Sequence, residues 1–152
     1  MYLAAATTPR FLQTPIANLE AAVPTKKPLI AIVDDDQSMR EATKGLMRSL
    51  GFDAEAFSSA DDFLRFPHLN RTACLVTDIH MPGMSGLDLH RSLVALGESI
   101  PTVLITAYPN ENLHARGLGP DIVGYLAKPF GEQDLLKCIR SALARGSDSE
   151  ND

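Results

Sequence analysis

Residues 73–88 read Ala-Cys-Leu-Val-Thr-Asp-Ile-His-Met-Pro-Gly-Met-Ser-Gly-Leu-Asp, and this stretch decides the fold. Its first four residues are apolar and predict a buried strand. The strand ends at Thr77 and Asp78, where a Pro-Gly turn begins. We therefore expect Asp78 at the carboxyl end of a buried strand, the edge at which open α/β sheets bind ligands. Taken alone, Asp78 is equally well explained as a residue that caps the turn.

Four further segments have the pattern of strands, and helical patterns alternate with them. The additional strands are expected at residues 29–33, 52–57, 100–106 and 122–127, the one at 52–57 as a half-exposed edge strand. Helices are expected at about residues 38–50, 58–66 and 132–145, and from Ser85 onward. This alternation predicts an α/β fold with a doubly wound, five-stranded parallel sheet and helices on both faces. Within residues 109–120, Gly117, Gly119 and Pro120 predict a fourth helix that is short or irregular.

The composition limits the function classes. The chain has 152 residues and a formal net charge of −5, without the basic stripe that a nucleic-acid surface needs. No apolar stretch approaches the 18 or more residues of a membrane span. Cys74 and Cys138 are too few for a disulfide framework and predict a reduced, cytoplasmic protein. Residues 1–28 predict a flexible N-terminal extension, and the polar residues 146–152 predict a disordered acidic tail.

Four of the predicted strands end in residues that carry chemistry. The first is followed by Asp34 and Asp35, and three others end at Asp78, Thr106 and Lys128. Because parallel strands point the same way, these ends meet at one edge of the sheet. Two carboxylates about 4 Å apart repel by roughly 4 kcal/mol at an effective dielectric constant of about 20. A lysine and a divalent cation would offset this repulsion, and a cluster of oxygen ligands suits Mg²⁺.

With those positive charges in place, Asp78 stays ionised and can act as a nucleophile. A phosphoryl group is the best-suited electrophile, because its transfer depends mainly on positioning and charge neutralisation. The expected product is a phosphorylated Asp78. Asp36 is expected only to cap the following helix. His68, His90 and His114 lack metal-ligand spacing and are expected to be solvated.

The same segments resemble the receiver domains of two-component response regulators. The resemblance covers about residues 29–143 and rests on the motifs Ile32-Val33-Asp34-Asp35-Asp36, Thr77-Asp78-Ile79-His80-Met81-Pro82-Gly83-Met84-Ser85-Gly86, Ile105-Thr106-Ala107 and Tyr125-Leu126-Ala127-Lys128-Pro129-Phe130. Residues 57–60 and 63–64 are most similar to the nitrogen-fixation regulator (FixJ-like) subgroup. The resemblance implies a flavodoxin-like fold with strand order 2-1-3-4-5 and a receiver domain at residues 29–145.

The resemblance also implies a magnesium site. Asp35 is similar to the direct carboxylate ligand of Mg²⁺, and Asp34 to the acid that helps through a water molecule. Asp78 and the backbone carbonyl of His80 would complete the protein ligands.

Further roles follow from the same resemblance. Asp78 would be the phosphoacceptor, and Lys128 the lysine that contacts the phosphoryl group, with a cis bond expected between Lys128 and Pro129. Thr106 is similar to the switch hydroxyl that closes on the phosphoryl group, and Tyr125 to the aromatic residue that turns inward in response.

The expected activity is that of a phosphorelay module rather than an enzyme. It would take a phosphoryl group from a sensor histidine kinase or phosphotransfer protein, catalyse only its own aspartyl phosphorylation and dephosphorylation, and then alter a protein–protein interaction. The output partner is unknown, and a homodimer on phosphorylation is one form of that output. No segment long enough for a helix-turn-helix follows the receiver. We therefore expect no DNA-binding domain and no membrane partner. The chain is expected to be a single-domain receiver or a fragment of a longer regulator.

Two other function classes remain open. The first is a hydrolase of the haloacid dehalogenase type. Asp34-x-Asp36 superficially matches the opening motif of that class, in which Asp34 would be the nucleophile. The second is a scaffold that has the fold but is never phosphorylated. Three repelling carboxylates beside a lysine and a threonine argue against a scaffold, because it has no use for them.

Overall fold

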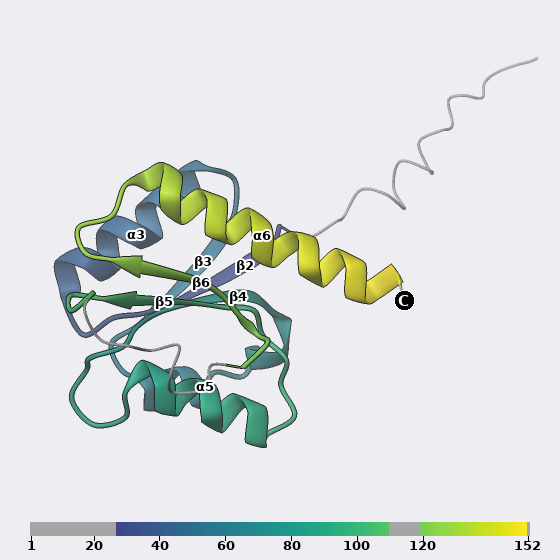
Figure 1. Cartoon of the computed structure of the whole chain (residues 1–152), viewed down its shortest axis with the longest axis horizontal. Coiled ribbons are helices and arrows are strands. Elements are labelled where there is room, and N and C mark those ends of the chain that lie inside the picture. Colours follow the sequence, from purple (N-terminus) through teal and green to yellow (C-terminus); the bar gives the residue numbers. More distant parts are fainter. Residues whose placement is uncertain (1–26, 110–118, 152) are drawn as a thin grey trace, which may run out of the picture.

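The computed structural model describes residues 27–109 and 119–151, with side chains as far as Arg145. These residues form a five-stranded parallel sheet with the order β3-β2-β4-β5-β6 (Figure 1). The strands are β2 (Leu29–Val33), β3 (Asp53–Phe57), β4 (Thr72–Asp78), β5 (Thr102–Thr106) and β6 (Ile122–Ala127). Counted along the chain, this order is 2-1-3-4-5, so the predicted α/β fold and strand order are confirmed.

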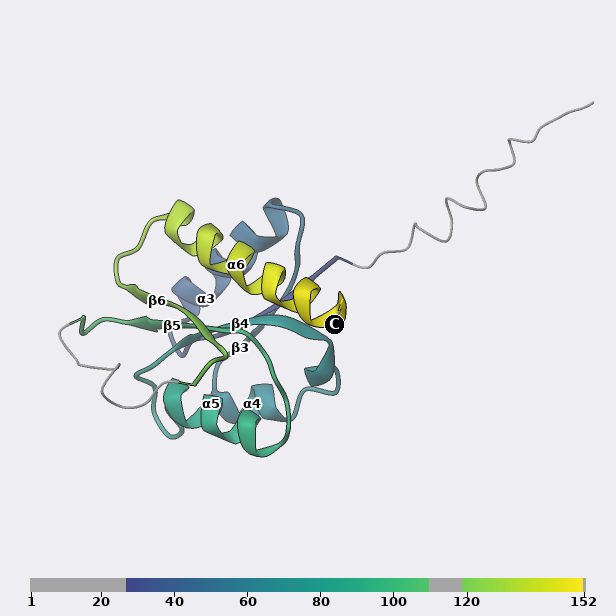
Figure 2. The same ribbon diagram turned by 45° about the vertical axis from the view of Figure 1, so that its right-hand side comes forward.

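Helices cover both faces of the sheet. They are α3 (Gln37–Ser49), α4 (Ala60–Leu64), α5 (Gly86–Ala95) and α6 (Glu132–Asn151), with a short 3₁₀ helix η1 (Leu69–Arg71) before β4. Helices α3 and α6 lie on one face, and α4 and α5 lie on the other (Figures 1 and 2). The fold is therefore doubly wound, as predicted.

The interior strand β2 shows why both faces need covering. All five of its residues are buried, and successive side chains point to opposite faces. Ile30 and Ile32 pack in the cluster that contains Met47 of α3 and Ile139 of α6, and Ala31 lies in the cluster on the opposite face. A continuous apolar run, rather than an alternating one, is what such a strand requires.

Side-chain caps fix where two of the helices begin. The Asp36 carboxylate accepts hydrogen bonds from the backbone N–H groups of Ser38 and Met39, which confirms that Asp36 caps α3. The Ser85 hydroxyl accepts from the backbone N–H of Asp88, and the Asp88 carboxylate accepts from the N–H of Ser85. This reciprocal capping box starts α5 directly after the loop that follows Asp78.

Some predicted element ends differ from the structure. Helix α4 is shorter than the predicted span of residues 58–66, because Ser59 caps it and the helix ends at Leu64. Helix α6 was expected to end near Arg145, yet it continues to Asn151, so residues 146–151 of the predicted disordered tail are helical. Gly146 therefore lies within α6 and does not end it, whereas Gly51, with its positive φ, follows the end of α3.

Two predictions fall mainly on residues that the structure does not describe. The flexible extension predicted at residues 1–28 and the irregular helix predicted at residues 109–120 lie largely outside the described ranges. Within the described ranges, no helix is both long and apolar enough to cross a membrane.

Candidate functional site

Three carboxylates meet at the carboxyl edge of the sheet. Asp34 and Asp35 follow β2, and Asp78 is the last residue of β4. Among the described residues, these three can each offer an oxygen atom such that all three atoms lie within 4.8 Å of one another. Asp34 and Asp78 are buried, and Asp35 is exposed. The structure thus brings together the acids that the sequence placed on this edge.

Lys128 reaches the same cluster from the end of β6. Its Nζ donates a hydrogen bond of 3.1 Å to Asp78 Oδ2 and lies 3.8 Å from Asp34 Oδ2. The peptide bond between Lys128 and Pro129 is cis, as expected from the family resemblance. One ammonium group therefore contacts two of the three carboxylates, and with all three ionised the cluster carries two negative charges in excess.

The surroundings of Asp34 raise the pKa of its carboxyl group. Burial is the main cause, supported by the charges of Asp78 and Asp35. A hydrogen bond from the Asp36 N–H to Asp34 Oδ1, 2.9 Å long, and the charge of Lys128 oppose that rise only in part. The ionised form of Asp34 is therefore disfavoured in this site, and an additional cation would stabilise it.

The pKa of Lys128 is also raised. Burial acts to lower it, but the hydrogen bond to Asp78 and the charges of Asp34 and Asp78 outweigh burial. Lys128 therefore carries its positive charge at neutral pH.

Thr106 stands at the end of β5, next to β4, and is fully buried. Its Oγ1 accepts a hydrogen bond of 2.9 Å from the backbone N–H of Tyr108. Its carbonyl accepts another, 2.8 Å long, from the backbone N–H of Lys128. A hydroxyl that accepts one hydrogen bond keeps its own hydrogen available for donation. Thr106 can thus donate to a group held at the sheet edge.

Tyr125 lies in β6 and is half-buried. It packs against an apolar cluster formed by Ile79, Leu87 and Leu104. Ile79 directly follows Asp78, so this cluster joins the loop after β4 to β6. Its position is compatible with the switch role, which stays a prediction.

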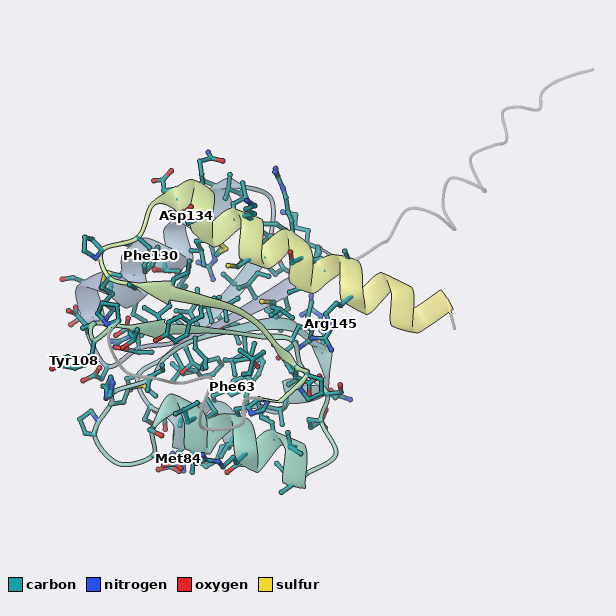
Figure 3. All side chains as sticks on the ribbon, in the orientation of Figure 1. Phe63, Met84, Tyr108, Phe130, Asp134 and Arg145 are labelled. Carbon is teal, nitrogen blue, oxygen red and sulfur yellow. The ribbon has the colours of Figure 1, made fainter. Side chains whose placement is uncertain are left out.

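The sequence reasoning missed a ring contact beside the site. The His80 and Tyr108 rings meet edge to face, with centroids 4.9 Å apart and planes at 90°. Figure 3 shows Tyr108 at the edge of the molecule where β5 ends. The spacing held a signal, because His80 and Tyr108 each stand two residues after a strand end, at Asp78 and at Thr106.

His90 also differs from its prediction. It was expected to be solvated, but it is only 8% exposed, on the inner side of α5. A Cβ atom added to Gly119 would lie 3.1 Å from Cε1 of His90. The absence of a side chain at position 119 therefore provides space for the His90 ring. Burial lowers the pKa of His90, and the charge of Asp121 opposes this effect. His90 lies apart from the acidic cluster, as does His68, and His114 falls outside the described residues.

The sequence pattern of the response regulator receiver domain matches residues 30–140. This chain belongs to the response regulator receiver family. That membership leaves the haloacid dehalogenase alternative without support.

Individual relatives place this receiver domain in the FixJ-like group. It is 41% identical over 115 residues to the response regulator protein TodT of Pseudomonas putida, covering 76% of this chain and 51% of TodT. It is 29% identical over 119 residues to the transcriptional regulatory protein FixJ of Azorhizobium caulinodans, covering 78% of this chain and 56% of FixJ. The crystal structure of FixJ-N superposes with a TM-score of 0.71 and 30% identity, over 79% of this chain and 96% of FixJ-N.

One solved neighbour was determined with Mg²⁺ and BeF. The response regulator TrrA of Thermotoga maritima, in complex with Mg²⁺ and BeF, superposes with a TM-score of 0.65 over 76% of this chain and 99% of TrrA. At 22% identity, this neighbour supports the fold alone.

These relatives correct one prediction. We expected no DNA-binding domain, but relatives such as FixJ are named transcriptional regulatory proteins. The receiver chain spans about half the length of the relatives it matches. The prediction that no DNA-binding domain accompanies this receiver is therefore wrong when it is set against these relatives.

Proposed function

We propose that this receiver domain is a cytoplasmic phosphoacceptor switch in two-component signal transduction. Asp78 would take a phosphoryl group from a phosphorylated histidine of a histidine kinase. The observation that carries the proposal is the 3.1 Å contact between Lys128 Nζ and Asp78 Oδ2, inside a cluster with two further carboxylates. This arrangement presents a carboxylate oxygen next to an ammonium group.

The donor set of the cluster fits Mg²⁺. Hard oxygen ligands suit this ion, and Asp34, Asp35 and Asp78 supply three of them close together. The two negative charges left over beside Lys128 match the charge of a divalent ion. Asp35 and Asp78 would hold Mg²⁺ with the His80 carbonyl, and Asp34 would assist. Once bound, the ion supplies charge neutralisation for the phosphoryl oxygens.

The transfer itself can be written from the residues of this chain. A carboxylate oxygen of Asp78 attacks the phosphorus atom of the phosphohistidine, and a new P–O bond forms. The P–N bond breaks, its electron pair goes to the imidazole nitrogen, and that nitrogen takes its proton from solvent. Lys128 faces the acceptor oxygen and can neutralise a phosphoryl oxygen, while the Thr106 hydroxyl is free to donate a hydrogen bond.

The consequence of phosphorylation would be a change in a protein–protein interaction. Thr106 would move toward the phosphoryl group, and Tyr125 would repack against the cluster of Ile79, Leu87 and Leu104. Receivers that work this way shift between two populated states. The domain would then act as a signalling module that catalyses only its own aspartyl phosphorylation and dephosphorylation.

Intact-mass measurement tests the proposal. The chain is incubated with Mg²⁺ and acetyl phosphate, and the same is done with Asp78→Asn and Asp36→Asn. Asp36 is a matched control, because its side chain is exposed and caps α3, a role that asparagine keeps. We expect one added phosphoryl group in the wild type and in Asp36→Asn, and none in Asp78→Asn. No adduct in the wild type, with acetyl phosphate or with a beryllofluoride mimic, would overturn the proposal.

A further inference from the structure

The position of Asp35 depends on the backbone on either side of it. Its side chain is exposed, and it lies beyond the end of β2. The pairing of β2 with its neighbours in the sheet extends as far as Val33. The direction of the Asp35 side chain therefore depends on its own φ and ψ, which are set by the two planar peptide groups that flank its Cα atom.

Hydrogen bonds hold both of these peptide groups. The carbonyl of Asp34 belongs to the peptide group before Asp35, and it accepts a hydrogen bond of 2.9 Å from Arg40 Nη1. The N–H of Asp36 belongs to the peptide group after Asp35, and it donates a hydrogen bond of 2.9 Å to Asp34 Oδ1. Asp35 thus stands between two fixed peptide planes, and Arg40 fixes the first of them.

Helix α3 places the Arg40 side chain. The Arg40 N–H donates a hydrogen bond of 2.9 Å to the Asp36 carbonyl, so Arg40 belongs to the first turn of the helix that Asp36 caps. The side chain is half-buried. A guanidinium group carries its N–H donors in one rigid plane, so it can fix the orientation of a carbonyl that it binds.

We propose that Arg40 is a positioning residue for the magnesium site, because it fixes the peptide group that precedes Asp35. Arg40 would not touch the ion, and would hold Asp35 in one conformation before the ion binds. The inference rests on the proposed function, in which Asp35 is a direct ligand of Mg²⁺. Loss of a group that orients a metal ligand typically lowers metal affinity by about 10–100-fold, and a single bond to a backbone carbonyl belongs at the lower end of that range.

The sign of the effect distinguishes positioning from charge. Arg40 carries a positive charge close to a cluster that would bind a cation, so removal of that charge alone should strengthen the binding of Mg²⁺. Loss of positioning has the opposite effect, because Asp35 then has to become ordered when the ion binds. We expect Arg40→Met to weaken Mg²⁺ binding by about tenfold, although one repelling charge is gone.

The experiment compares Arg40→Met with the matched control Arg48→Met. Arg48 lies in the last turn of the same helix, and its Nη2 donates a hydrogen bond of 3.0 Å to the carbonyl of Ala54 in β3. Each variant therefore loses one arginine charge and one hydrogen bond to a carbonyl. Isothermal titration calorimetry with Mg²⁺ alone should show a Kd about tenfold higher in Arg40→Met and unchanged in Arg48→Met.

A second measurement separates this role from general loosening of the fold. The rate at which acetyl phosphate phosphorylates Asp78 is measured at increasing Mg²⁺ concentration. Arg40→Met should need about tenfold more Mg²⁺ for its half-maximal rate, and its rate at saturating Mg²⁺ should match that of the wild type. A rate that stays equally low at every Mg²⁺ concentration would contradict a role in metal binding.

The outcomes are distinguishable from failure of the proposed function. A wild type that gains no phosphoryl group would overturn the proposed function itself. A wild type that binds Mg²⁺ and is phosphorylated, beside an Arg40→Met variant whose Kd for Mg²⁺ is unchanged or lower, would overturn only this inference. An equal rise of Kd in Arg40→Met and Arg48→Met would also overturn it, because the effect would then not depend on the peptide group before Asp35.

Discussion

Lys128 Nζ lies 3.1 Å from Asp78 Oδ2 and 3.8 Å from Asp34 Oδ2, so one ammonium group links carboxylates at the carboxyl ends of two neighbouring strands. The Lys128 side chain reaches both carboxylates from the end of β6, which is an edge strand of the sheet. The hydrogen bond from the Lys128 N–H to the Thr106 carbonyl, 2.8 Å long, fixes the backbone from which the side chain extends. The lysine is thereby held in place before any phosphoryl group arrives.

Removal of the Lys128 charge should slow phosphorylation of Asp78. A hydrogen bond to a charged group contributes about 1.5–3 kcal/mol, which corresponds to a rate loss of roughly ten- to a hundredfold if it acts in the transition state. Lys128→Met is compared with the wild type by intact mass over time, in acetyl phosphate and Mg²⁺. Lys137→Met, on the exposed side of α6, is the matched control and should behave as the wild type. Equal rates in Lys128→Met and the wild type would contradict the role of Lys128.

Magnesium should stabilise the folded chain. A ligand that binds only the folded state, at a hundred times its Kd, adds about 2.7 kcal/mol to the free energy of unfolding. For a domain of this size that corresponds to an increase in Tm of about 5–10 °C. Asp35→Asn should remove most of this increase, because it removes an exposed ligand while the buried acids stay.

The measurement is thermal unfolding with EDTA and with saturating Mg²⁺. Glu55→Gln, an exposed acid on the edge strand β3, is the control for loss of a negative charge far from the cluster. It should keep the full increase in Tm. An unchanged Tm of the wild type at saturating Mg²⁺ would show that the cluster holds no metal.

The stability of the metal-free chain should depend on pH through Asp34. Its pKa in the folded state is raised above 3.8, mainly by burial. The folded state therefore binds this proton more tightly than the unfolded state, so the free energy of unfolding falls as pH rises from about 3.8 through the raised pKa. Above that pH range Asp34 is fully ionised, and the free energy of unfolding falls no further through this group.

Asp34→Asn has no such titration and still offers an oxygen atom to the Asp36 N–H. In EDTA at pH 7 its free energy of unfolding, measured with urea, should exceed that of the wild type. The difference should shrink as the pH is lowered toward 3.8. Lower stability of Asp34→Asn at pH 7 would show that the attraction to Lys128 outweighs burial.

The placement of the site could be read from the sequence because it depends on strand ends. Asp34, Asp78, Thr106 and Lys128 each follow a run of apolar residues that has to be buried, and a parallel sheet brings such ends to one edge. The contact between Lys128 and Asp78 follows from that rule and from opposite charge, without knowledge of the loops.

Other features depended on details that no periodic pattern carries. The contact between His80 and Tyr108 is set by the path of two loops, and the spacing after Asp78 and Thr106 was its only signal. The burial of His90 depends on the missing side chain of Gly119, which lies far along the sequence. The end of α6 depended on the conformation of Gly146, which can continue a helix or end it.

Gly86 should be intolerant of any side chain, because α5 begins against the backbone of the phosphoacceptor. A Cβ atom at Gly86 would collide with the backbone carbonyl of Asp78 and lie 3.1 Å from the Cα of Ile79. Backbone atoms cannot move aside cheaply, so Gly86→Ala should lower the free energy of unfolding by about 1–3 kcal/mol. It should also slow phosphorylation, since the loop after Asp78 has to shift.

Gly45 offers the matched control in the same chain. It is exposed within α3, and a Cβ atom there would meet nothing within 4 Å. Gly45→Ala should therefore raise the free energy of unfolding by about 0.5–1 kcal/mol, because alanine loses less backbone freedom in a helix than glycine. Urea unfolding of the two variants checks the opposite signs. If Gly86→Ala also raised the free energy of unfolding, α5 would be able to move away from Asp78. The first turn of α5 would then not fix the loop after the phosphoacceptor.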